Sequence, residues 1–262
     1  MAGAFKALIV TVRQVALDHV ELIVEHERLR DATPGQFAHI LTPGTLRRPV
    51  SFSRIDGGLG RAGLLVQVVG PGTAWIAARQ VGETLDMLAP LGRGFAPPDP
   101  DRPWALVGGG VGIPPLFSAW ERWGWRHRAP AHVILGARKA ALVLMDADFR
   151  QQAIEPLVTT EDGSRGIMGT VVDPLRQWLS RNPDGQVMAC GPNGMLARVS
   201  ALTEGIAGPV QLALEQRMGC GIGACLACVV PSVPVGPDGP GYRRVCTEGP
   251  VFQREELAWS WI

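Results

Sequence analysis

The 262-residue chain lacks a long uninterrupted apolar run. Its two longest stretches without charge, 103–120 and 218–237, are broken by glycine, proline or cysteine, which a membrane-spanning helix tolerates poorly. The apolar patch at 7–12 is too short for the hydrophobic region of a signal peptide, and no cleavage site follows it. We therefore expect no membrane segment and a cytoplasmic protein.

An excess of charge of one sign is also missing. The chain has 25 Lys and Arg against 24 Asp and Glu, and no basic run, so nothing in it indicates nucleic-acid binding. Cysteine is scarce, and four of the five cysteines lie in the last 43 residues. A chain of this length does not need a disulfide framework, so this crowding favours thiols that hold metal.

The first hundred residues predict β-structure. Segments 7–12, 20–25 and 63–69 are rich in β-branched and apolar residues and are separated by turn signals. Short strands at this spacing are typical of a small barrel or sandwich. Residues 95–103 contain closely spaced prolines that forbid regular structure, which indicates a linker.

The pattern then changes to an alternation of strand and helix. The predicted strands are 104–107, 132–135, 155–159 and 186–189, with helical stretches between them. This alternation favours a parallel sheet covered on both faces. Cysteines and loops dominate from about residue 210 onward.

Four cysteines are spaced as in plant-type [2Fe–2S] proteins. Cys220, Cys225 and Cys228 read C-x4-C-x2-C, and Cys246 follows separately. The small residues between them allow a tight loop whose backbone N–H groups point at sulfur. Zinc sites favour C-x2-C pairs on both sides, so the spacing favours an iron–sulfur cluster, with zinc as the alternative.

Several short motifs suggest nucleotide binding. Arg48-Pro49-Val50-Ser51 opens a predicted strand, where an arginine can pair with a pyrophosphate. The turn at 70–73 and the glycine-rich turn at 108–112 could each approach a phosphate or a nucleotide closely. The second turn departs from the G-x-G-x-x-G spacing, so we expect a variant of dinucleotide binding. Cys190-Gly191-Pro192 ends the last predicted strand, where ligands bind in open α/β sheets.

In this order, the motifs resemble the ferredoxin-reductase superfamily. The cysteine module, 214–228 and 245–252, is similar to the electron-transfer subunit of class 1B dihydroorotate dehydrogenase, and the resemblance covers essentially the whole chain. It implies an α+β multidomain fold with an FAD-binding antiparallel β-barrel at 1–98, an NAD-binding α/β parallel-sheet domain at 99–209 and a small [2Fe–2S] module at 210–262.

The resemblance also implies roles for particular residues. Metal ligands would be the four clustered cysteines, and Cys190 would lie near the nicotinamide. The expected cofactor-binding residues are Arg48, Pro49, Val50, Ser51, Val66, Gln67, Val68, Gly72, Thr73, Gly109, Gly110, Gly112, Glu161 and Asp162. The family often has Tyr-Arg where this chain has Val66-Gln67, so only backbone contacts to the flavin are expected there.

The implied function is electron transfer from a partner subunit through [2Fe–2S] and FAD to NAD+, in pyrimidine biosynthesis. The implied partner is an FMN-containing dihydroorotate dehydrogenase catalytic subunit, in a heterotetramer of two plus two. A homologous NAD(P)H–ferredoxin oxidoreductase, or a hydrogenase or sulfite reductase diaphorase subunit, is the near alternative. A zinc-bearing nucleotide-binding regulator is the alternative of another class.

Two expectations concern specificity and catalysis. Glu161 and Asp162 follow a middle strand of the α/β region, where carboxylates would repel a 2′-phosphate and so favour NAD over NADP. The five histidines fall away from every motif, which indicates structural or surface roles.

Overall fold

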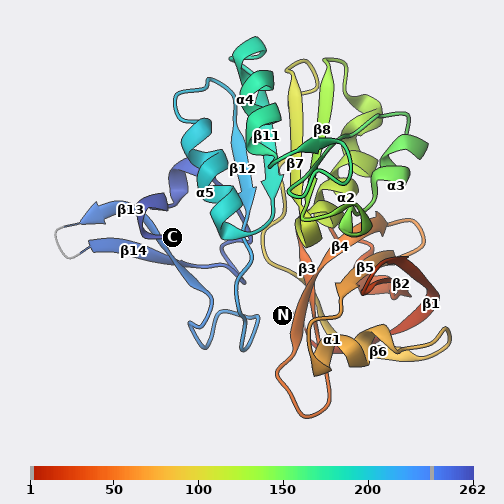
Figure 1. Ribbon diagram of the computed structural model, residues 1–262. Helices are drawn as coiled ribbons and strands as arrows, with labels where there is room; N and C mark the ends of the chain where they lie inside the picture. The colour runs from red at the N-terminus through yellow and green to blue at the C-terminus, as the bar shows by residue number, and fades with distance from the viewer. Residues whose placement is uncertain (1–2, 237–238) are drawn as a thin grey trace.

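The computed structural model describes residues 3–236 and 239–262. It contains a closed barrel, a seven-stranded sheet with helices on both faces, and a hairpin (Figure 1). The strands are β1 (Phe5–Ala16), β2 (His19–Glu25), β3 (Phe37–Ile40), β4 (Arg48–Asp56), β5 (Arg61–Gln67), β6 (Thr84–Leu91), β7 (Trp104–Gly109), β8 (Ala131–Ala137), β9 (Leu157–Thr160), β10 (Ile167–Met168), β11 (Gln186–Cys190), β12 (Val210–Ala213), β13 (Val229–Gly236), β14 (Gly239–Arg244) and β15 (Val251–Gln253). The helices are α1 (Pro71–Ala77), α2 (Ile113–Trp123), α3 (Asp146–Gln151), α4 (Val172–Arg181) and α5 (Asn193–Leu202).

The barrel is antiparallel and closes in the order β1-β2-β5-β4-β3-β6. Its interior is filled by fully buried apolar side chains, such as Ile9, Leu22, Phe52 and Leu64. Closure leaves the barrel without a free strand edge. The predicted antiparallel barrel is thus confirmed, although β3 and β6 were not predicted from the sequence.

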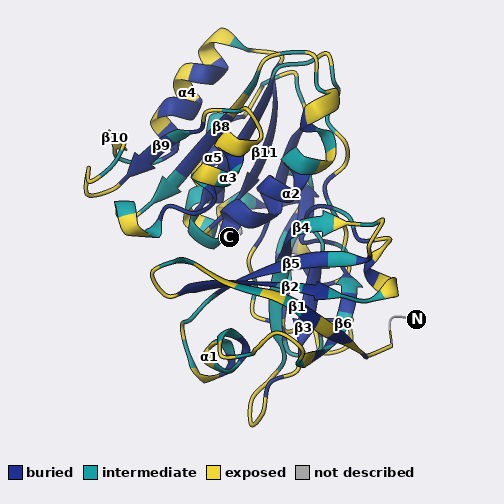
Figure 2. Ribbon diagram, turned by 90° about the vertical axis from the view of Figure 1, so that its right-hand side faces the viewer, coloured by how far each residue is buried: buried dark blue, intermediate teal, exposed yellow. Residues whose placement is uncertain are grey.

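The seven-stranded sheet has the order β10-β9-β8-β7-β11-β12-β15, and every pair except β12–β15 is parallel. Because side chains alternate along a strand, β7 contributes side chains to the cores on both faces of the sheet. Trp104 and Leu106 pack with α2 and α3, whereas Ala105 and Val107 pack with α4 and α5. Figure 2 shows the strands buried between helices with exposed outer faces, as expected for a parallel sheet.

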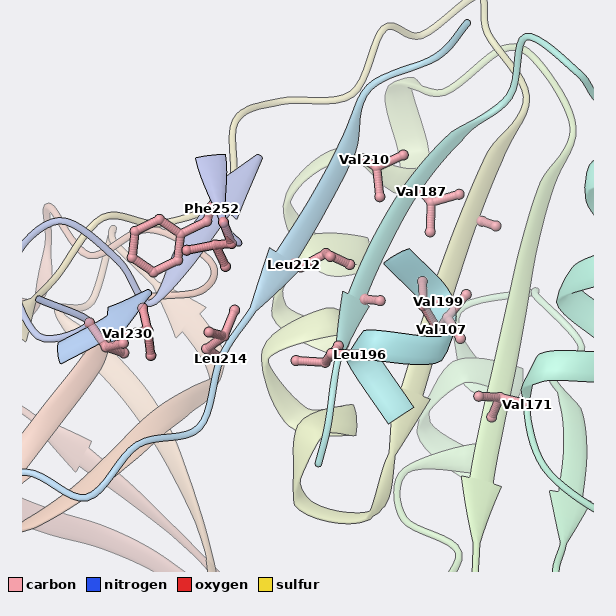
Figure 3. Packing of buried hydrophobic residues seen from close by; sticks show 14 of the residues in the cluster. Val107, Val171, Val187, Leu196, Val199, Val210, Leu212, Leu214, Val230 and Phe252 are labelled. Atoms are coloured by element: carbon pink, nitrogen blue, oxygen red, sulfur yellow. The ribbon is translucent and has the colours of Figure 1, made fainter. Parts of the chain in front are cut away.

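The core on the α4 and α5 side continues into the cysteine-rich region. Leu212 of β12 shares this core with Val230 of β13, Phe252 of β15, and the buried Cys228 and Cys246 (Figure 3). Strand β15 joins the sheet by antiparallel pairing with β12. The cysteine region is therefore attached to the nucleotide sheet by both hydrogen bonds and apolar packing.

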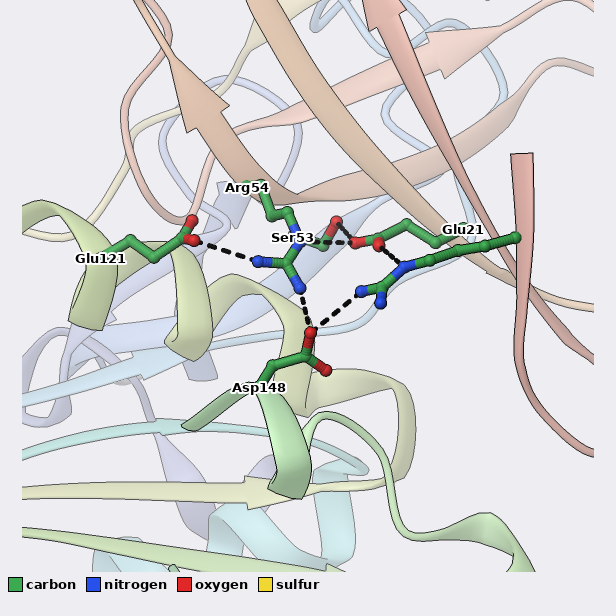
Figure 4. A network of polar contacts seen from close by, with 6 residues as sticks. Glu21, Ser53, Arg54, Glu121 and Asp148 are labelled. Carbon is green, nitrogen blue, oxygen red and sulfur yellow. Dashed lines mark hydrogen bonds and ion pairs between the residues drawn. The ribbon is translucent and has the colours of Figure 1, made fainter. Parts of the chain in front are cut away.

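A polar network joins the barrel to the α/β region (Figure 4). Glu21 of β2 has a fully buried side chain and accepts hydrogen bonds from Ser53 Oγ at 2.6 Å and Arg13 Nε at 2.7 Å. Arg54 of β4 lies 3.4 Å from the same carboxylate. Its other nitrogens reach Glu121 of α2 and Asp148 of α3, and its guanidinium lies over the ring of Phe117, 4.6 Å from the centroid. One arginine thus contacts carboxylates from both regions.

In the described ranges, no helix is both long enough and apolar enough to cross a membrane.

Replacing Arg54 tests this interdomain network. Arg54→Met keeps much of the side-chain length but leaves Glu21 and Asp148 with one cation fewer, and we expect a loss of about 2 kcal/mol in the free energy of unfolding, less than for a fully buried pair. Urea unfolding followed by tryptophan fluorescence measures it. Arg128→Met, which removes an exposed pair with Asp101, is the control and should leave the midpoint unchanged. Equal midpoints for the two variants would contradict the proposed role.

Candidate functional site

The four clustered cysteines come from two segments. Cys220, Cys225 and Cys228 lie on the loop between β12 and β13, and Cys246 follows β14. The Cys220 thiol lies beside Cys225, and the Cys246 thiol lies beside Cys228 and within electrostatic reach of Cys220. In addition, the backbone N–H of Cys246 donates to Cys228 Sγ at 3.4 Å. The loop therefore brings all four predicted ligands into one module.

The loop backbone is arranged to stabilise a thiolate. Three N–H groups, from Ile222, Ala224 and Cys225, lie 3.3–3.5 Å from Cys220 Sγ. Burial opposes ionisation, but these donors outweigh it and lower the pKa of the Cys220 thiol to about 6. Gly221 and Gly223 adopt φ of +72° and +84°, which allows the tight turn around the sulfur.

The geometry of the thiols bears on the metal they can hold. Four cysteines in one module, with three backbone N–H groups directed at Cys220 Sγ, fit the thiolate ligands of a [2Fe–2S] cluster. The residues present thus fit a [2Fe–2S] cluster.

Cys190 lies apart from this module. It ends β11, is buried with the α2 side of the sheet, and lies opposite Gly108 of β7 in the parallel register. Burial, and secondarily the negative charge of Glu215, raise the pKa of its thiol well above the usual range. Cys190 therefore remains protonated and is a neutral side chain at the end of its strand.

Two barrel motifs meet at Arg48. The Arg48 side chain lies directly over Gly72 of α1: a Cβ added there would lie 2.7 Å from Arg48 Nε. Thr73 accepts hydrogen bonds from the backbone of Val69 and Gly70, at 2.9 Å and 3.2 Å, and so fixes the turn before α1. A guanidinium placed over a glycine backbone is a cradle suited to a pyrophosphate.

A cavity of about 360 Å³ lies between the barrel and the α/β region. Its lining includes Pro49, Val50, Ser51, Val66, Gln67 and Thr73. The Val66 side chain is packed in the barrel core, and the expected contact of its backbone with the flavin stays a prediction. Val68 lies outside the lining, and its N–H donates to Asp18 at 2.8 Å. We refer to this space as the flavin cavity because its dimensions and largely apolar walls suit an isoalloxazine ring.

A second cavity of about 460 Å³ lies at the carboxyl ends of the parallel strands. Gly109 and Gly110 line it, as do Thr159, Glu161 and Arg198. We refer to it as the nucleotide cavity, because ligands bind at this edge of open α/β sheets. Its lining shares Gln67, Val111 and Glu215 with the flavin cavity, so the two cavities are direct neighbours.

Two of the predicted nucleotide-binding residues, Gly112 and Asp162, do not line the nucleotide cavity. Gly112 lies outside the cavity lining and packs on the strand that ends at Cys190, where a Cβ would lie 2.3 Å from the Cys190 carbonyl oxygen. Asp162 also lies outside the lining and bonds to Ser164, with its carboxylate oxygen 2.6 Å from Ser164 Oγ. Of the two predicted carboxylates, only Glu161 faces the nucleotide cavity.

Sequence analysis missed several residues at these sites, among them Glu215, His39 and His19. Glu215 follows β12 and lines both cavities, and burial raises the pKa of its carboxyl. Its position after a parallel strand was the available signal, but β12 was hidden in the cysteine region. His39 of β3 is fully buried against the cluster loop, so the expectation that all histidines lie away from the motifs is wrong. Strand pairing brings it there, which sequence distance does not reveal.

The pKa of the His39 ring is lowered, chiefly by burial, although the nearby main chains of Cys220 and Arg47 oppose this. The imidazole is therefore neutral and carries a single N–H. His19 is the other misjudged histidine, since it lines the nucleotide cavity.

Comparisons with known proteins match two parts of the chain to family models. Residues 215–258 match the iron–sulfur cluster binding domain of dihydroorotate dehydrogenase B. Residues 106–201 match the oxidoreductase NAD-binding domain.

Relatives match over nearly the whole length. The electron transfer subunit of dihydroorotate dehydrogenase B (NAD(+)) from Desulforamulus reducens is 34% identical, with 99% of this chain and 100% of that protein covered. The subunit of the same name from Geobacillus thermodenitrificans is 39% identical, with 98% and 99% covered.

Solved structures agree with the fold. The NADH-dependent reduced ferredoxin-NADP oxidoreductase matches with a TM-score of 0.82 and 28% identity, covering 99% of this chain and 92% of that one. The ferredoxin reductase of carbazole 1,9a-dioxygenase, at 19% identity and a TM-score of 0.69, shares the fold over 80% of this chain and 68% of its own. The cluster loop, the paired cavities and the full-length relatives together show that the chain belongs to the family of dihydroorotate dehydrogenase B (NAD(+)) electron transfer subunits.

Proposed function

We propose that this chain carries electrons to NAD+ as the electron transfer subunit of a dihydroorotate dehydrogenase complex in pyrimidine biosynthesis. The observation that carries the proposal is the continuity of three sites: Gly221 of the cluster loop contacts His39 of β3, β3 pairs with β4, and β4 lines a flavin cavity adjoining the nucleotide cavity. The proposed units remain 1–98 for FAD, 99–209 for NAD and 210–262 for the cluster, with β12 and β15 completing the sheet.

In this proposal, FAD is held by the barrel. FAD supplies the exchange between a two-electron hydride and single electrons, which the protein side chains cannot perform. Arg48 would hold the pyrophosphate beside Gly72, and Val50, Ser51 and Val66 would hold the ring in the flavin cavity. Gln67 and Glu215 face both cavities, so they lie where the ring and the nicotinamide would meet. Cys190 lies outside the lining of both cavities, so its place near the nicotinamide stays a prediction.

Part of the cluster loop is exposed and suited to contact with a partner protein. Cys225 is exposed on its loop, and the apolar side chains of Ile222 and Leu226 beside it are 54% and 58% exposed. Exposed apolar side chains around a redox centre suit a protein interface. We therefore propose that an FMN-containing catalytic subunit binds here, in a heterotetramer of two plus two. None of the five cysteines forms a disulfide, which suits the reducing cytoplasm that we propose as its location.

A second candidate is a diaphorase subunit that serves ferredoxin, a hydrogenase or a sulfite reductase. The similarity to the ferredoxin-NADP oxidoreductase at a TM-score of 0.82 favours it. Co-purification from the native cell distinguishes the two: the proposal expects a dihydroorotate-oxidising flavoprotein as the partner. A hydrogenase or sulfite reductase catalytic subunit in its place would contradict it.

Visible and EPR spectra of the purified protein test the cofactors directly. We expect flavin and [2Fe–2S] absorption, bleaching on anaerobic addition of NADH, and the EPR signal of a reduced cluster. Colourless protein that contains zinc would instead support the alternative of a nucleotide-binding regulator.

The cluster ligands are tested by serine substitution. Cys220→Ser, Cys225→Ser, Cys228→Ser and Cys246→Ser should each lower iron and sulfide per chain severalfold, because a thiolate ligand is lost. Cys190→Ser is the matched control and should retain the cluster. Loss of iron in that control, with retention in one of the other four, would refute the assignment.

Arg48 is tested through FAD retention. Arg48→Ala removes a charge-assisted contact worth about 1.5–3 kcal/mol, so the dissociation constant for FAD should rise about ten- to a hundredfold. Fluorescence of FAD released on dialysis measures it. Arg61→Ala removes a barrel arginine that pairs with Glu25, and it should leave affinity unchanged. Equal FAD affinity of wild type and Arg48→Ala would contradict the proposed binding of the pyrophosphate by Arg48.

Nucleotide preference is tested at Glu161. The carboxylate repels a 2′-phosphate, so kcat/KM should favour NADH over NADPH at least tenfold, about 1.4 kcal/mol. Glu161→Gln should reduce this preference severalfold, whereas Asp162→Asn should preserve it, because Asp162 faces Ser164. Diaphorase assays with both nucleotides decide the matter. An NADPH preference in the wild type would contradict the proposal.

A further inference from the structure

His39 is a buried polar side chain whose ring nitrogens are incompletely hydrogen-bonded within the described residues. It lies in the short strand β3, and its exposed fraction is 0%. Neither Nδ1 nor Nε2 makes a hydrogen bond of good geometry within the described residues, although the main chains of Cys220 and Arg47 lie close enough to the ring to affect its pKa. Buried polar groups in proteins are almost always hydrogen-bonded, so an exception calls for a cause such as a missing ligand.

The ring lies directly against the cluster loop. A Cβ added to Gly221 would lie 2.5 Å from His39 Nδ1, so only glycine allows the loop to approach this closely. Gly221 lies between Cys220 and Ile222, whose N–H points at Cys220 Sγ. The imidazole therefore contacts the main chain that shapes the surroundings of this sulfur.

The same residue also belongs to the flavin-binding sheet. In the register of β3 with β4, His39 faces Pro49 and Phe37 faces Ser51. Pro49, Ser51 and Phe37 all line the flavin cavity. His39 thus stands between the wall of the flavin cavity and the main chain of the cluster loop.

We propose that His39 is a positioning residue for the iron–sulfur cluster, holding the Cys220–Gly221 main chain against the flavin-binding sheet with its N–H directed to that end of the cluster. This inference rests on the proposed function. Hydrogen-bond donors near the sulfur ligands stabilise the reduced, more negatively charged cluster, so they raise its reduction potential. His39 would therefore shift the equilibrium of the electron between the flavin and the cluster toward the cluster.

The decisive experiment compares two substitutions in the complete protein. His39→Leu keeps side-chain bulk but removes the donor, whereas His39→Asn places an amide near the position of Nδ1. EPR-monitored redox titration should show a tenfold shift of the flavin–cluster electron equilibrium away from the cluster in His39→Leu, equivalent to 59 mV. His39→Asn should restore most of it. Equal cluster potentials and EPR spectra in His39→Leu and wild type would overturn the inference.

A second measurement applies if His39→Leu fails to assemble. Gly221→Ala should lower cluster content more than Gly223→Ala, because both glycines have positive φ but only Gly221 lies against His39. In a His39→Ala background, the difference in cluster content between the two glycine variants should disappear. A difference of unchanged size would overturn the inference. Absence of a cluster from the wild type would instead refute the proposed function, so the two failures are distinguishable.

Discussion

The pairing of β15 with β12 is the interaction on which the arrangement of the sites depends. It aligns Val251 with Ala213 and Phe252 with Leu212, and it attaches the cysteine module to the edge of the nucleotide sheet. Glu215 follows one of these strands and Cys246 precedes the other. The same few hydrogen bonds therefore position a residue of the two cavities and a cluster ligand. Phe252 packs into the shared core and makes this edge apolar as well as hydrogen-bonded.

The barrel is held to the same frame by a different kind of force. Arg54 connects the buried Glu21 of the barrel to Glu121 and Asp148 on helices of the α/β region. Such a network is sensitive to direction, so it fixes orientation where apolar packing alone allows sliding. An electron carrier needs redox groups at fixed separation. The β12–β15 pairing and the Arg54 network hold the three sites in fixed positions relative to one another.

The sequence predicted the local features of this molecule well. The cysteine spacing, the alternation of strands and helices, and the glycine-rich turns are all short-range patterns, and the predicted fold class and family are confirmed. What it missed depends on pairing between distant segments. Strands β12 and β15 were hidden in a region read as loops, so Glu215 was overlooked. His39 lies 181 residues before Cys220 in sequence, and only the barrel and its packing bring it to Gly221. Glu161 and Asp162 are adjacent in sequence but face different surroundings, which only the turn geometry determines.

The central claim is that electrons pass between NADH and the cluster only by way of the flavin. Stopped-flow mixing of NADH with protein that has lost FAD but retains its cluster tests this most directly. The account predicts that the cluster stays oxidised over the time in which the complete protein is fully reduced, and that added FAD restores the reaction. Reduction of the cluster at an unchanged rate without FAD would contradict it.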